Sequence, residues 1–181
     1  MLTTIAILLA FTAMRIFNAD SGEPNLLPLM ALAFTGSAYL GRLYWIIPVV
    51  VMVATDIYIN QHHGLPLVSE WTLVGASCYL GAALLGRYLA DKKSWTSMIF
   101  GTATMSLMFY FISNSYVFFT SPSYGVGVSE WVRALTTGVP GFPPTYMFLK
   151  NSLIADLTFT VGFMTFQSVQ QLVLPKWASQ A

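Results

Sequence analysis

Long apolar runs separated by short polar stretches make up most of the chain. A transmembrane helix needs roughly 20 predominantly apolar residues, within a range of about 17 to 25. Six runs are about that long and predict six membrane-spanning helices, at residues 2–18, 25–41, 43–60, 70–88, 96–119 and 147–174. The first run lacks the basic n-region of a signal peptide, so we expect it to be a span.

Composition agrees with a membrane location. Hydrophobic residues make up 56% of the chain and charged residues 8%, whereas soluble domains carry about 25% charged residues. The net charge of +1 provides no basic patch, so we expect no nucleic-acid partner. The chain has no Gly-rich phosphate loop, so an ATP-driven step would need another subunit. We therefore predict an all-α integral membrane protein in which residues 1–181 form a single transmembrane domain in the lipid bilayer.

The basic residues favour a cytoplasmic N-terminus, because most of them then fall on the inner side. With six spans, both termini are cytoplasmic. The predicted inner residues are Arg42, Arg87, Lys92, Lys93 and Lys176, and the predicted outer ones are Arg15, Arg133 and Lys150. The long segment 120–146 is then an outer loop, with Gly- and Pro-rich stretches around a short predicted helix from Ser129 to Thr137. Loops of this length are usually functional, so we interpret it as a lid over the outer face, the alternative being an ordinary surface loop.

Polar residues inside the predicted spans gather in their outer halves. They are Asn18, Asn25, Asp56, Asn114, Asn151 and Asp156. This one-sided distribution predicts a cavity that opens outward, although asparagines also form ordinary hydrogen bonds between membrane helices. An ionised group at that depth needs water, a cation, a hydrogen-bonding network or a ligand. Asp56 is the better candidate for a site residue, and Asp156 is a candidate structural partner for a group at the end of a span.

The span at 70–88 carries small residues and the sole cysteine on one helical face. These residues are Gly75, Cys78, Tyr79, Ala82 and Gly86. On this span alone, close helix packing is the favoured interpretation, and a flat ligand lying against the same face is the alternative. One cysteine cannot build a zinc site, but it can supply one axial ligand to a metal held in a macrocycle. The adjacent His62 and His63 are a second choice as metal ligands.

Several short motifs together suggest a family. They are Gly75-Ala-Ser-Cys-Tyr-Leu-Gly81, Phe17-Asn18, Gly36-Ser-Ala-Tyr-Leu-Gly41, Thr55-Asp56, Ser113-Asn114 and Asn151-Ser-Leu-Ile-Ala-Asp156. With six spans and an outward cavity, the chain resembles the BtuM family over nearly its whole length. That family comprises cobalamin-specific, solitary relatives of the substrate-binding S-components of energy-coupling-factor transporters.

The resemblance implies an S-component-like bundle in the bacterial cytoplasmic membrane that takes up cobalamin. Cys78 would coordinate the cobalt, as a soft thiolate ligand can, with the corrin held in the outer half of the bundle. Donation from sulfur, with a reductant, could also release an upper cyanide, which would make decyanation an incidental activity. The residues expected to line the ligand site are Asp56, Gly75, Tyr79, Ala82, Asn114 and Asn151. A stripe containing Ala6 and Ala10 would dock on a coupling subunit with its ATPase module, although small-xxx-small pairs are frequent in membrane helices.

Three alternatives stay open. The bundle could be an S-component for another vitamin or precursor, in which case Cys78 would not matter for binding. It could be an intramembrane enzyme with Cys78 as nucleophile, which would need a base within reach. It could also be a purely structural bundle, in which Asp56 and Cys78 affect stability alone.

Overall fold

The computed structural model describes residues 2–17, 27–40 and 45–178. All the regular secondary structure in these ranges is helical, so the prediction of an all-α chain is confirmed for this part of the protein. The elements are α1 (Leu2–Phe17), α2 (Leu29–Tyr39), α3 (Ile47–His62), α4 (Glu70–Tyr88), the 3-10 helix η2 (Ala90–Lys92), α5 (Trp95–Thr120), α6 (Val128–Leu135) and α7 (Thr145–Ala178). Asn18, Asn25 and Arg42, which the sequence analysis placed at span ends, lie outside the described residues.

The six predicted runs each contain or overlap one helix, and the short helix predicted in segment 120–146 corresponds to α6. Among the described helices, α5 alone is both long and apolar enough to cross a membrane by length and composition. The 11-residue α2 is a shorter apolar helix. The helical bundle is therefore established, and six membrane crossings stay a prediction.

Serine residues determine where two of the long helices begin. The Ser69 hydroxyl accepts a hydrogen bond from the Thr72 backbone N–H at 3.2 Å, and Thr72 in turn accepts one from the Ser69 backbone. Ser94 and Ser97 form the same reciprocal pair at the start of α5. Such capping boxes satisfy backbone donors that a helix start otherwise leaves unpaired.

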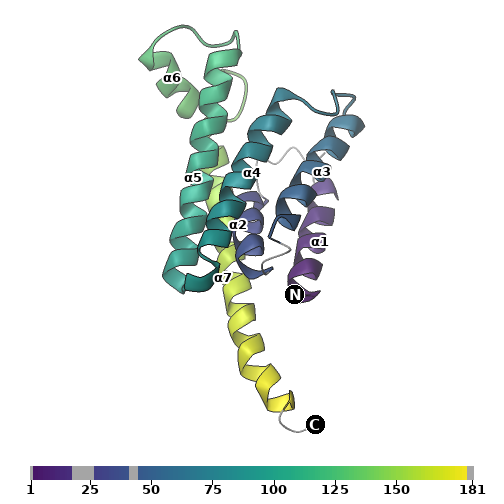
Figure 1. Ribbon diagram of the computed structural model, residues 1–181. Coiled ribbons are helices and arrows are strands. Elements are labelled where there is room, and N and C mark those ends of the chain that lie inside the picture. Colours follow the sequence, from purple (N-terminus) through teal and green to yellow (C-terminus); the bar gives the residue numbers. More distant parts are fainter. Residues whose placement is uncertain (1, 18–26, 41–44, 179–181) are drawn as a thin grey trace.

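Helix α2 lies at the centre of the bundle and contacts α1, α3, α4, α5 and α7 (Figure 1). All its residues from Met30 to Ala38 are buried. Two glycines make this close packing possible. A Cβ atom at Gly86 would lie 2.1 Å from the Phe34 carbonyl oxygen, and one at Gly101 would lie 2.3 Å from the Phe34 ring. The buried Phe34 therefore fits only because α4 and α5 present bare backbone to it.

The N-terminus of α2 is capped by a residue from the other end of the chain. Asp156 on α7 is 1% exposed, and its carboxylate accepts hydrogen bonds from the Ala31 backbone N–H at 2.9 Å and from the Ser106 hydroxyl at 2.6 Å. A carboxylate at this position satisfies free N–H groups and complements the helix dipole. The prediction that Asp156 is a structural partner for a group at a span end agrees with this arrangement.

The two ends of the bundle differ. The start of α1 and the end of α7 lie toward the end opposite to α6 (Figure 1). The α3–α4 connection and the segment that holds α6 lie at the other end (Figure 1). We call the latter the α6 end, and it carries the polar residues described next.

Candidate functional site

Two pockets lie side by side at the α6 end. The first, which we call the Asp56 pocket, has a volume of about 220 Å³ and is lined by Arg15, Leu29, Asp56, Ile59, Asn60, Trp71, Thr72, Val74, Gly75, Tyr79, Phe109 and Ser113. The second, which we call the loop pocket, has a volume of about 350 Å³ and is lined by Trp71, Phe109, Tyr110, Ser113, Asn114, Tyr124, Val139, Phe142, Pro143, Thr145, Phe148 and Ser152. Because Trp71, Phe109 and Ser113 line both, the two pockets form neighbouring compartments of one region.

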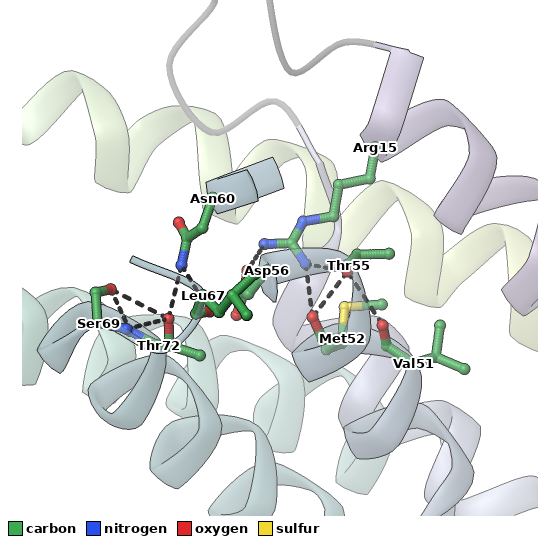
Figure 2. Close-up of polar contacts among 9 residues, drawn as sticks. All are labelled: Arg15, Val51, Met52, Thr55, Asp56, Asn60, Leu67, Ser69 and Thr72. Carbon is green, nitrogen blue, oxygen red and sulfur yellow. Dashed lines mark hydrogen bonds and ion pairs between the residues drawn. The ribbon is translucent and has the colours of Figure 1, made fainter. Parts of the chain in front are cut away.

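The only ion pair that the described residues place in the Asp56 pocket joins α1 to α3 (Figure 2). The Arg15 guanidinium donates to Asp56 Oδ1 and to the Thr55 hydroxyl, and it reaches the Met52 carbonyl oxygen at 3.0 Å. The Arg15 and Asp56 side chains are only 11% and 16% exposed. A charge pair with so little water around it attracts more strongly than one on an open surface, so it fixes α1 against α3.

A second polar cluster joins α3 to α4 beside this pair (Figure 2). The Asn60 side-chain amide donates to the Thr72 hydroxyl at 2.9 Å and to the Leu67 carbonyl oxygen at 3.4 Å. Thr72 belongs to the capping box that begins α4. The residues that start α4 thus also hold the wall of the pocket.

Segment 120–146 contributes several walls of the loop pocket and is tied to α5. The Tyr110 hydroxyl donates to the Leu135 carbonyl oxygen in α6, and the Trp131 indole N–H donates to the Ser115 hydroxyl at 3.0 Å. The segment is also braced internally, because Arg133 pairs with Glu130 at 2.5 Å. The segment therefore forms part of the wall of this compartment, and its role as a lid stays a prediction.

The structure brings some of the predicted site residues together and separates others. Asp56, Gly75 and Tyr79 line the Asp56 pocket, and Asn114 lines the loop pocket. Asn114 also donates to the Tyr110 carbonyl oxygen one turn earlier in its own helix, at 2.7 Å. Ala82 is 0% exposed in the core, so at this position the face of α4 serves helix packing. Asn151 is half-buried and is not among the residues that line the two pockets.

Cys78 lies one turn along α4 from Gly75 and is half-buried against the hydrophobic core. It lines neither of the two pockets. Its thiol is free of any disulfide, and the carboxylate of Asp56 is engaged by Arg15. Nothing in this geometry therefore favours a cysteine nucleophile, which needs an activating base.

The described residues contain no group of three or more His, Cys, Asp or Glu side chains that could hold a metal ion. His62 stacks with Tyr58 at 6.4 Å between ring centroids and contacts the His63 ring edge-on at 5.5 Å. The two histidines are thus part of an aromatic cluster at the end of α3. This finding does not apply to a metal that is already bound in a macrocycle, because such a metal needs only one ligand from the protein.

Sequence reasoning missed the partner of Asp56. The sequence predicts that Arg15 lies on the outer side of the membrane but indicates no partner for it. Asn60 and Thr72 also line the pocket, although no sequence pattern indicates them. The sequence does hold a signal for this pair, because Arg15 and Asp56 carry opposite charges at the same predicted depth in the runs 2–18 and 43–60. A carboxylate buried in an apolar bundle requires such a partner.

In the part of the chain that the structure describes, the fold is a helical bundle with pockets lined by charged and aromatic residues at one end. The chain belongs to DUF6580, a family of unknown function, whose model matches residues 1–177. No curated protein and no solved structure matches the chain.

Proposed function

We propose that the protein is a multi-pass membrane protein that binds a small organic solute at its α6 end, as the substrate-binding component of an uptake system. The observation that carries this proposal is the buried Arg15–Asp56 pair, which lies beside aromatic walls in an otherwise apolar bundle. Binding sites for small molecules characteristically combine apolar and aromatic walls with a few placed polar groups.

The outer surface of the bundle supports membrane embedding. Large apolar side chains are exposed along the faces of the long helices, at Leu73, Leu80 and Leu84 of α4, Phe100, Leu107 and Phe111 of α5, and Ile154 and Val161 of α7. Soluble monomers rarely expose large continuous apolar surfaces. A helix of 26 residues such as α5 is about 39 Å long, which exceeds the hydrocarbon thickness of about 30 Å.

Cobalamin is the ligand that the resemblance to the BtuM family suggests, with Cys78 as the axial ligand of cobalt. A corrinoid is larger than the drug-sized molecules that occupy pockets of about 300–1,000 Å³, and the Asp56 pocket holds about 220 Å³. In this proposal corrinoid binding therefore requires the pocket region to widen and to extend to Cys78, which lines neither pocket. In this proposal the chain's own contribution is one soft sulfur ligand and the surrounding apolar wall.

A spectroscopic experiment tests this ligand. The detergent-purified protein is incubated with aquocobalamin, free ligand is removed by gel filtration, and the visible spectrum of the protein fraction is recorded. The wild type should retain the corrinoid with a spectrum that differs from that of free aquocobalamin, and Cys78→Ala should abolish that difference. Ser77→Ala is the matched control, because Ser77 is exposed and bonds to the Leu73 carbonyl oxygen of its own helix at 2.8 Å.

A wild-type protein that retains no corrinoid would exclude cobalamin as the ligand. In that case a panel of other vitamins, tested for an increase in melting temperature, distinguishes an S-component for another solute from a structural bundle. A Cys78→Ala variant that binds with the wild-type spectrum would show that the thiol is not the cobalt ligand.

A further inference from the structure

The hydrogen-bond donors of the Asp56 pocket are largely engaged by the protein itself. Arg15 donates to Asp56, to Thr55 and to the Met52 carbonyl oxygen. The Asn60 amide nitrogen donates to Thr72 and Leu67. Three of the five N–H groups of Arg15 thus donate to protein acceptors, so a ligand carboxylate would compete with these partners for the guanidinium.

The acceptor atoms of the pocket, in contrast to its donors, keep lone pairs that the described part of the protein does not use. The Leu67 carbonyl can only accept, so it fixes the orientation of the Asn60 amide and turns Asn60 Oδ1 away from Thr72 (Figure 2). The Ser113 hydroxyl donates its proton to the Tyr110 carbonyl oxygen at 3.2 Å, which leaves lone pairs on the Ser113 oxygen. Both residues line the Asp56 pocket.

Asp56 supplies the charged acceptor. Its Oδ1 accepts from Arg15, while its Oδ2 lies toward Gly75 on α4, 3.5 Å from the position that a Cβ atom on Gly75 would take. Because Gly75 has no side chain, the space beside Oδ2 belongs to the pocket that both residues line. A larger residue at position 75 would occupy that space.

We infer that the Asp56 pocket recognises a nitrogen head group that carries N–H donors, a primary amide or an ammonium, at Asp56 Oδ2, and that Gly75 is the residue that keeps this oxygen open. The inference rests on the proposed function in assuming that a solute enters this pocket. Asn60 Oδ1 and the Ser113 oxygen accept further N–H groups, and the rings of Trp71 and Phe109 contact the carbon body of the ligand. A positively charged head group gains additional attraction from the ring faces.

Two glycine substitutions in α4 separate this role from packing. In Gly75→Ala the new methyl group meets its nearest neighbours at 3.5 to 3.8 Å, an ordinary contact distance, so the fold accepts it. In the control Gly81→Ala nothing lies within 4 Å of the new methyl group. Both substitutions raise helix propensity by the same amount, so equal or raised melting temperatures without ligand show that both variants are folded.

The probes are propionamide, propylammonium chloride and sodium propionate, which share a carbon skeleton and differ in the head group. Each is titrated into detergent-purified protein at constant ionic strength, and the melting temperature is recorded. For the wild type and Gly81→Ala we expect propionamide or propylammonium to raise the melting temperature and propionate to have a smaller effect. For Gly75→Ala the apparent affinity for the same probe should fall by roughly tenfold or more, the range set by losing one hydrogen bond to a charged group.

Three results would overturn the inference. These are an absence of stabilisation by both nitrogen probes, stabilisation by propionate that equals or exceeds theirs, or an unchanged response in Gly75→Ala. The corrinoid experiment is read separately, so a protein that binds propionamide through Gly75 but retains no corrinoid would refute cobalamin and leave the head-group assignment standing.

Discussion

Replacing Asp156 with alanine should destabilise the protein strongly, because the carboxylate closes the N-terminus of the central helix. The substitution leaves the buried Ala31 N–H without its acceptor at 2.9 Å, which costs about 1–3 kcal/mol. It also removes the charged hydrogen bond from Ser106 at 2.6 Å, which is worth about 1.5–3 kcal/mol. Ser106 keeps its other acceptor, the Thr102 carbonyl oxygen at 3.0 Å. The expected loss in the free energy of unfolding is therefore about 3–5 kcal/mol.

Asparagine at the same position should be far less harmful. Its amide oxygen can accept from the Ala31 N–H, and its NH₂ group can donate to the Ser106 oxygen, provided that the Ser106 proton goes wholly to Thr102. Every group then keeps a partner, and only the contribution of the charge is lost, at about 1 kcal/mol. Ser106→Ala should lie between the two, because it removes one bond and leaves the helix cap in place.

The measurement is thermal unfolding of the detergent-solubilised protein, followed by helical ellipticity. For a chain of this size, each kcal/mol lowers the melting temperature by about 2–4 °C, so Asp156→Ala should melt roughly 10 °C lower and Asp156→Asn a few degrees lower. If Asp156→Asn were as unstable as Asp156→Ala, the negative charge would matter more than the hydrogen bonds. An Asp156→Ala variant with the wild-type melting temperature would refute the capping role.

Two other sites give predictions that the same melting assay checks. Gly86→Ala should lower stability by about 1–3 kcal/mol, because its Cβ would lie 2.1 Å from the Phe34 backbone oxygen, whereas Gly81→Ala should not, and equal melting curves for the two would contradict this packing. Arg15→Met should cost about 3–5 kcal/mol by leaving the Asp56 carboxylate without its partner, and adding Asp56→Asn to that variant should recover part of the loss; no recovery would show that Arg15 acts through something other than Asp56.

The helices of this bundle could be predicted from the sequence, because apolar runs and breaker residues are local signals. The predicted run 70–88 coincides with α4, whose start the Ser69–Thr72 capping box determines. The boundaries of α2 were predicted less well. The sequence predicts a full span over 25–41, but the helix begins only at Leu29. Its apolar residues are enclosed by other helices, and composition cannot distinguish a helix buried in protein from one that faces lipid.

The candidate site could be predicted only in part, because its contacts join distant segments. Depth along the spans identified Asp56 and Asn114 as neighbours of one end of the bundle, and both line pockets there. The partner of Asp56 lies 41 positions earlier in the chain, and no local pattern indicates which helix packs against which. For Cys78, spacing placed it on the packed face of α4, but the rotation that keeps it out of both pockets depends on how α4 sits against its neighbours.

The cap on α2 has a consequence for the order in which the protein can assemble. Ala31 and Asp156 are separated by 125 positions, so the residue that caps α2 is synthesised long after α2 itself. Until α7 emerges, α2 is a short helix of 11 residues with unpaired N–H groups and no complete enclosure. The centre of the bundle therefore closes only after α7 has been synthesised, and nascent chains that lack α7 cannot reach the native core.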